Sequence, residues 1–269
     1  MENIILTSKE FLFLCAGMGV TEVYGIVDGY KDVDLSDIST EIRLVQQSLE
    51  KKGYIESDFD GNSSVRSEVI AFVAACATCQ KIIAFDYQLK SGATTNRVYY
   101  FSNDVVVKSE RNNNEYHLSY ISKDIISNEI KDDIKLSEIA SPQRFNKVHI
   151  PQRELDKIKE MVLADDRKTA IIAMKKYFDT NFTEVILDSF EKKENFYAIV
   201  AVDFTSDENN IKNIMFINSE IANIKLEPIV VDLKTEIEFE EIDEEAIFKL
   251  IDGHLTYLIP KKNGDDIDG

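Results

Sequence analysis

Two cysteines three residues apart form the sharpest chemical pattern in the sequence. Cys76-Ala-Thr-Cys79 has the spacing of a redox pair or of half a zinc site. A thioredoxin-type pair begins a helix after a strand, whereas this pair ends an apolar helix and continues its apolar stripe. A zinc site needs two more ligands, and the remaining cysteine (Cys15) and the three histidines have no paired spacing. We therefore expect buried thiols and no cofactor, with metal or redox use as the alternative.

Nucleophilic catalysis and phosphate binding have little support. The sequence contains no Gly-x-Ser-x-Gly elbow, and the histidines lie in unrelated contexts, at His117, His149 and His254. The segment Gly25-x-x-x-Gly29 is followed by Tyr and Lys rather than by the Gly-Lys-Ser/Thr of a phosphate loop. We predict that the protein is not an enzyme.

An acidic stretch, Glu236–Glu245, holds seven carboxylates in ten residues. Paired carboxylates can act as acid and base or bind a hard cation, and Glu240 and Glu241 would be the residues to test. The interpretation we favour is a solvated edge strand that turns Ile237, Phe239 and Ile242 inward and leads into a helix N-terminus.

Charge and length restrict the class of protein. The 269 residues carry 31 Lys+Arg against 49 Asp+Glu, a net charge of −18. Nucleic acids and anionic membranes both require a basic surface, so we expect neither as a partner. The first twenty residues lack the basic region of a secretory signal, no window is apolar enough for a spanning helix, and three cysteines do not make a disulfide framework. We predict a cytoplasmic protein without membrane insertion.

The first half of the chain begins with helices and continues with strands. Thr7-Ser-Lys-Glu10 has the pattern of a capping box before a helix that ends near Gly17 or Gly19. Apolar spacing predicts two more helices, over about 36–52 and 64–78. Short β-branched and aromatic runs then predict a four-stranded antiparallel meander over 81–89, 97–102, 105–110 and 116–122, followed by a short helix near 124–130.

The second half repeats this order. Helices are predicted over 152–163, 169–178 and 183–192, and a closing helix over 244–253. Strands are predicted between them, over 195–205, 212–218, 221–226, 229–233 and 236–240. Two of the four prolines fall in residues 137–151, which we interpret as the join. The predicted organisation is therefore an N-terminal half (1–136), the join (137–151), a C-terminal half (152–260) and a polar tail (261–269).

This order predicts an α+β fold in which antiparallel sheet is covered by helices, with two structurally similar halves in a quasi-two-fold arrangement. Strand residues 98–101, 197–202 and 214–217 are apolar at successive positions, whereas a strand with one wet face alternates. Both faces of the sheet should therefore be covered.

Residues 35–56 also have the sequence pattern of a winged-helix DNA-binding domain, in which the recognition helix ends at a wing, here Lys-Gly-Tyr. Arg43, Lys51 and Lys52 offer few phosphate contacts within so acidic a chain. A winged-helix transcriptional regulator is nevertheless the alternative function.

The order of elements resembles a known family. Three phrases, LTSKEFLFLCAGMGV, LVQQSLEKKGYIE and SEVIAFVAACATCQKIIAFDY, together with the paired strands that end near Leu233, are similar to the EspG family of type VII (ESX) secretion chaperones. The resemblance spans about residues 4–255. It implies a quasi-two-fold fold and a non-enzymatic role in which the protein binds a helical secretion substrate, shields its apolar tip and delivers it for export.

The family binds PE–PPE pairs, but the composition here is that of a low-GC Gram-positive protein, rich in Ile, Lys and Asn and without Trp. The resemblance therefore suggests a WXG- or LXG-type client, either a helical secreted protein or the N-terminal domain of an effector, with a PE–PPE-like pair as the alternative. The residues we nominate for partner binding are Tyr99 and Phe101 on one strand face and Met215 and Ile217 on another. The alternative is that all four are plain core.

Overall fold

The computed structural model describes residues 3–57, 63–88, 94–134, 147–192, 195–205 and 210–258. The first part of the chain comprises β1 (Asn3–Thr7), α1 (Ser8–Gly17), α2 (Ile38–Lys51), β2 (Ile55–Ser57), β3 (Ser63–Val65), α3 (Ser67–Ala77), β4 (Lys81–Gln88), β5 (Thr94–Ser102), β6 (Val105–Asn112), β7 (Glu115–Tyr120), a 3-10 turn (Lys123–Ile125) and α4 (Ile126–Asp133). The rest comprises β8 (Val148–Pro151), α5 (Gln152–Leu163), α6 (Arg167–Met174), α7 (Thr180–Lys192), β9 (Phe196–Asp203), β10 (Asn210–Asn218), β11 (Asn223–Val231), β12 (Lys234–Glu241) and α8 (Glu244–Leu258).

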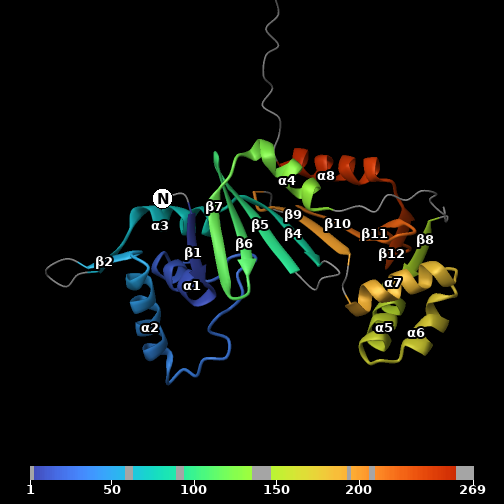
Figure 1. Cartoon of the computed structure of the whole chain (residues 1–269), viewed down its shortest axis with the longest axis horizontal. Helices are drawn as coiled ribbons and strands as arrows, with labels where there is room; N and C mark the ends of the chain where they lie inside the picture. The colour runs from blue at the N-terminus through green and yellow to red at the C-terminus, as the bar shows by residue number, and fades with distance from the viewer. Residues whose placement is uncertain are drawn as a thin grey trace, which may run out of the picture. The chain divides into compact units, whose positions relative to one another are not determined.

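Ten strands form one sheet in the order β1-β7-β6-β5-β4-β9-β10-β11-β12-β8, and β2 and β3 form a separate hairpin. The strand pairs with described register are antiparallel, from β1 with β7 to β12 with β8. The predicted α+β class and antiparallel sheet are therefore confirmed (Figure 1). The quasi-two-fold relation of the halves stays a prediction, as do the domain boundaries at the 137–151 join.

The chain divides into two compact units, each assembled from separate segments. Unit 1 comprises Met1–Ala84, Asn96–Ile126 and Val202–Asn210, and unit 2 comprises Phe85–Thr95, Ser127–Ala201 and Ile211–Gly269.

In unit 1 the predicted capping box is present and begins α1. The Thr7 hydroxyl accepts from the Glu10 amide at 3.3 Å, and the Glu10 carboxylate accepts from the Thr7 amide at 2.7 Å. Strand β1, which the sequence analysis did not predict, precedes it and turns Ile4 and Leu6 into the core opposite Leu118 and Tyr116 of β7. Helix α1 packs against α2, α3 and β1.

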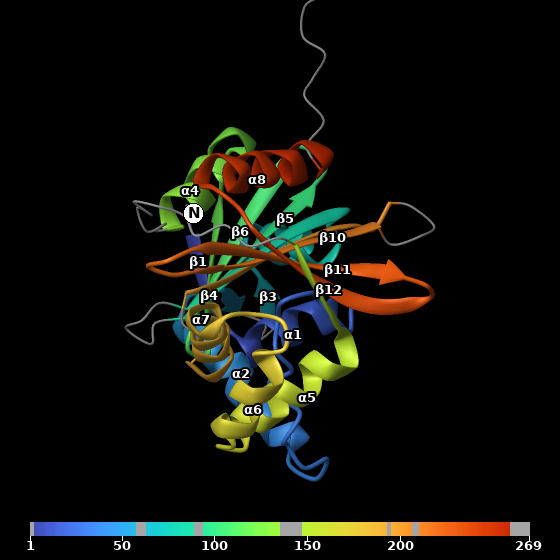
Figure 2. The same ribbon diagram turned by 90° about the vertical axis from the view of Figure 1, so that its right-hand side faces the viewer.

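In unit 2 helices cover both faces of the strands. Helices α5–α7 lie on one side of β11 and β12, and α8 lies with α4 on the other side (Figures 1 and 2). Asp252 of α8 accepts hydrogen bonds from Ser127 and Lys131 of α4 at 2.7 and 2.6 Å. The apolar cluster beneath α5–α7 includes Phe178 and Phe239, whose rings meet edge to face at 5.3 Å. This two-sided cover agrees with the prediction drawn from consecutive apolar strand residues.

Two strand predictions were wrong in detail. Residues 221–226 and 229–233 form one strand, β11, that runs through Pro228. The register with β10 ends at Leu226, so the missing N–H of Pro228 falls where no β10 partner needs it. The predicted edge strand of the acidic stretch, β12, is not an edge: β11 pairs on one side and β8, within the predicted join, on the other.

Candidate functional site

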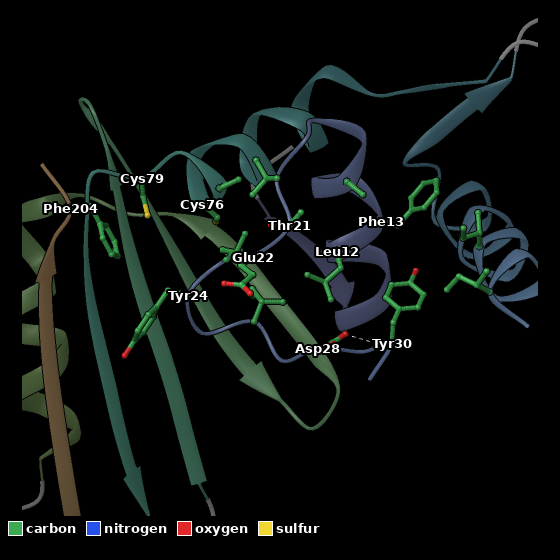
Figure 3. Close-up of a pocket in the computed structure, with 17 residues that line it drawn as sticks. Leu12, Phe13, Thr21, Glu22, Tyr24, Asp28, Tyr30, Cys76, Cys79 and Phe204 are labelled. Carbon is green, nitrogen blue, oxygen red and sulfur yellow. Dashed lines mark hydrogen bonds between the residues drawn. The ribbon is translucent and has the colours of Figure 1, made fainter. Parts of the chain in front are cut away.

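The candidate site is a groove in unit 1 with a volume of about 920 Å³. Its walls come from α1, the loop between α1 and α2, α2, the C-terminal end of α3 and one residue after β9 (Figure 3). In this view Phe13 and Tyr30 lie at one end, and Cys79, Tyr24 and Phe204 lie at the other. The lining residues are Leu12, Phe13, Ala16, Val20, Thr21, Glu22, Val23, Tyr24, Ile26, Asp28, Tyr30, Ile38, Ile42, Cys76, Ala77, Cys79 and Phe204.

Helix α1 contributes to the groove because its sequence is apolar on more than one side. Phe11 and Leu14 turn into the core and are buried. Leu12 and Phe13 are only half-buried and line the groove, and Ala16 beside them is exposed. A surface helix of an isolated domain normally presents polar residues there, so this second apolar side indicates a surface that contacts something else.

The loop between α1 and α2 is held by tyrosines of the sheet. The Tyr100 hydroxyl, which is buried, donates to the Tyr24 carbonyl at 2.6 Å. The Tyr116 hydroxyl accepts from the Val27 amide at 3.0 Å. Gly25 adopts a φ of +79° and approaches the sheet so closely that a Cβ there would lie 2.8 Å from a valine methyl carbon. These contacts fix the position of this wall.

The other end of the loop packs on the start of α1. The Tyr30 hydroxyl donates to the Lys9 carbonyl at 3.1 Å, and a Cβ on Gly29 would lie 2.9 Å from atoms of both Ser8 and Lys9. The loop therefore closes against the helix without room for a larger residue at position 29. The groove is a preformed feature of unit 1.

The rim of the groove is acidic. Residues 21–42 carry six carboxylates and one lysine. Glu22 and Asp28 line the groove and are exposed. Glu41 pairs with Lys9, so part of the charge is compensated within the chain. Glu22 and Asp28, the two carboxylates that line the groove, give this surface a negative potential that attracts cationic groups.

Both cysteines of the pair line the groove, and neither thiol is activated by a lowered pKa. Burial raises the pKa of Cys76 well above its usual range and raises the pKa of Cys79 to about 11. Cys15, buried beside α3, has a pKa raised to about 12 for the same reason. All three are free thiols, protonated at neutral pH and therefore poor nucleophiles. Within the described part of the chain, no three His, Cys, Asp or Glu side chains gather as metal ligands.

Part of the acidic stretch is paired with cations of its own unit. Glu238 accepts from Lys147 at 2.8 Å and lies 3.0 Å from His149 Nε2, and these contacts lower the pKa of its carboxyl group. Glu240 contacts Lys225 at 2.9 Å. Ile237 and Phe239 point inward as predicted, whereas the acidic face is half-buried rather than fully solvated. The ion pairs of Glu238 and Glu240 give these two carboxylates a structural role within the sheet.

The other histidines are not brought together with the acidic stretch. His117 lies on β7, 4.0 Å from Glu115, and the His254 Nδ1 lies 3.0 Å from the Leu250 carbonyl within α8. Burial lowers the pKa of His254, which favours the neutral ring.

The four nominated partner residues lie in the interior or against it. Tyr99, Phe101 and Ile217 are at most 5% exposed, and Met215 is partly buried against the apolar cluster of unit 2. Arg97 donates to the Tyr99 hydroxyl at 3.3 Å. In this conformation a partner would not reach the three buried side chains. Their burial is what the alternative interpretation, that these residues belong to the core, predicts.

One of the three basic residues that a winged-helix regulator would use for phosphate contacts is already paired within the chain. Lys52 donates to the buried Glu10 carboxylate at 2.7 Å and to the Ile5 carbonyl at 3.2 Å. A hairpin, β2 and β3, does follow α2 as a wing would. Arg43 and Lys51 are exposed, which leaves two cations of the predicted set for phosphate contacts.

The groove was not recognised from the sequence because its walls combine α1, the loop after it and α2 with residues near the end of α3 and with Phe204, which are distant in the chain. One signal was available: residues 20–27 form a loop, yet Val20, Val23, Tyr24, Ile26 and Val27 are apolar. Loops that cross a surface are usually polar, and so an apolar loop indicates a wall that packs against something.

No helix in the described residues is long and apolar enough to cross a membrane. No protein-family model and no curated protein sequence matches the chain. Among solved structures, the chain is similar to the Mycobacterium tuberculosis type VII secretion system chaperone EspG5, solved in complex with the PE25–PPE41 dimer. The two share 12% identity at a TM-score of 0.59, over 94% of this chain and 96% of that chain. The chain therefore has the EspG5 fold, as the resemblance in sequence pattern predicted.

Proposed function

We propose that this protein is a cytoplasmic chaperone or adaptor that binds a helical type VII secretion substrate, keeps it soluble and targets it for export. The observation that carries the proposal is the likeness to EspG5 over 94% of the chain, since EspG5 is a secretion chaperone that was solved with its PE25–PPE41 partner. An open apolar groove and the protonated thiols beside it are consistent with binding rather than catalysis.

The proposed client class rests on the EspG resemblance together with the source that the composition suggests. A chain rich in Ile, Lys and Asn without Trp is typical of a low-GC Gram-positive protein, and in such a source we expect a WXG- or LXG-type substrate rather than a PE–PPE pair. The resemblance implies that the client exposes an apolar tip, and covering such a tip is expected to raise the solubility of the client.

Co-expression tests the proposal. Each WXG, LXG or PE–PPE substrate encoded in the source genome is expressed alone, with this protein, and with an unrelated acidic protein of similar size. We expect one substrate to become soluble only with this protein and to elute with it as a complex of defined stoichiometry. If every substrate has the same solubility with either companion and none co-elutes, the proposal is wrong, and a mobility-shift assay for DNA binding becomes the next experiment.

A further inference from the structure

We propose that the groove of unit 1 binds one amphipathic helix of the client, with the apolar ridge of that helix in the groove and lysine or arginine residues along its flank. This inference rests on the proposed function and assigns to it a surface and a partner chemistry.

Exposed apolar side chains on the walls of the groove indicate that the partner helix presents an apolar ridge. Ile42 on α2, Tyr24 in the loop and Phe204 after β9 are 38, 44 and 42% exposed, and all three line the groove. Single exposed apolar residues are common, but three on the walls of one concave surface indicate a docking site. A volume of about 920 Å³ holds several side chains, which fits the anchor residues on one face of a helix.

The basic flank follows from the acidic rim. Glu22 and Asp28 line the groove, and residues 21–42 hold six carboxylates with one lysine. An acidic helix would bring like charges together in a chain whose net charge is already −18. Lysine or arginine beside the apolar ridge would pair with this rim, so charge complementarity selects the occupant.

Preorganisation makes the groove suitable for binding. The hydrogen bonds of Tyr100 to Tyr24 and of Tyr116 to Val27 hold the loop wall in place before any partner arrives. A helix docking there orders little of this protein, and less of the interaction free energy is lost to entropy.

The test uses two fluorescein-labelled helical peptides of about 18 residues with identical leucines at i, i+3, i+4 and i+7 spacing, one flanked by lysine and the other by glutamate. Binding to the full chain is followed by fluorescence anisotropy. We expect the lysine peptide to bind at least about tenfold more tightly than the glutamate peptide, and this preference to shrink between about 50 mM and 500 mM NaCl.

Matched variants separate the groove from general attraction to an acidic protein. Ile42→Lys and Leu44→Lys add the same charge to the same helix at residues that are 38 and 50% exposed, but only Ile42 lines the groove. We expect Ile42→Lys to weaken binding of the lysine peptide at least about tenfold and Leu44→Lys to change it less than about twofold. Ala16→Lys, at an exposed groove position on α1, is the second variant should Ile42→Lys unfold.

Two further measurements locate the peptide and its charge contacts. Glu22→Gln should weaken binding of the lysine peptide several-fold, whereas Glu50→Gln, an equal charge change at an exposed residue of α2 that does not line the groove, should leave it nearly unchanged. Bound peptide should also slow the alkylation of Cys79, which lines the groove and is half-buried.

Equal effects of Ile42→Lys and Leu44→Lys, equal affinity for the two peptides, or unchanged alkylation of Cys79 would each overturn the inference. The same variants are then tested with the co-expressed client. A client that binds the unaltered protein and every groove variant equally well refutes the groove assignment and leaves the proposed function standing. A client that fails to bind even the unaltered protein refutes the proposed function itself.

Discussion

Removing the charge of Lys52 should destabilise unit 1 strongly, because the lysine compensates a buried carboxylate. The side chain of Glu10 is 2% exposed and that of Lys52 is 27% exposed, with 2.7 Å between their charged atoms. Glu10 also accepts from the Thr7 amide and the Ser48 hydroxyl, each at 2.7 Å. Burial acts to raise the pKa of Glu10, but the contacts with Lys52, Thr7 and Ser48 outweigh it and the pKa is lowered below 4.5.

The expected magnitudes follow from the difference in exposure. Lys52→Met keeps the alkyl stem but leaves an uncompensated carboxylate in the interior, which should cost about 3–4 kcal/mol of unfolding free energy. Glu10→Gln leaves a lysine that water still reaches, and so the cost should be smaller, about 1–2 kcal/mol. The double variant should cost less than the sum of the single variants by about 1–3 kcal/mol.

Urea unfolding followed by far-UV circular dichroism measures these differences in a chain without tryptophan. Lys51→Met, at the exposed neighbouring position on α2, is the matched control and should stay within about 0.5 kcal/mol of the unaltered protein. Because the folded pKa of Glu10 is depressed, its contribution is present above pH 4.5 and is lost as the pH falls through the folded value. A cost for Lys52→Met no larger than for Lys51→Met would refute the reasoning.

Three other predictions concern backbone, core and thiol chemistry. Gly25→Ala should cost more unfolding free energy than Gly53→Ala. Both glycines have positive φ, for which about 1 kcal/mol is expected at Gly53, but only a Cβ at Gly25 would also meet another atom, at 2.8 Å. Phe239→Ala, which removes the buried ring against Phe178, should cost about 3–5 kcal/mol in urea unfolding. Alkylation of Cys79 should be slow at neutral pH and accelerate up to about pH 11, and a plateau near neutral pH would contradict its raised pKa.

The parts of the fold that sequence predicted well depend on local signals. Thr7 and Glu10 are three residues apart and fix the start of α1 by their own hydrogen bonds. Helix α5 has the predicted bounds, Gln152–Leu163, because Leu155, Ile158 and Val162 are buried along one face and keep helical spacing. Such signals require nothing from distant parts of the chain.

Strands β1 and β8 could not be predicted in the same way. They have five and four residues, and each becomes a strand only through a distant partner: Ile4 faces Leu118, and Ile150 faces Ile237. Runs this short carry too little alternation to indicate a strand by themselves. The interpretation of β12 as an edge failed for the same reason, since the strand that covers it, β8, was not recognised.

The groove illustrates a further limit. Apolar strand residues such as Tyr99 and Ile217 looked like candidate contacts because both faces of their strands are apolar, yet the same pattern is what a doubly covered sheet requires. Tyr24 carries the more informative signal, because an apolar residue in a loop has no core of its own to enter, whereas Ile42 continues the apolar stripe of Val45 and Leu49 on α2. Whether such residues meet in one concave surface depends on how the loop folds back, and here that depends on a hydrogen bond from Tyr100, 76 residues away in sequence. A binding surface built on non-local contacts therefore has to be identified from the folded chain, although its members can be suspected from residues that are apolar where the local pattern calls for polar ones.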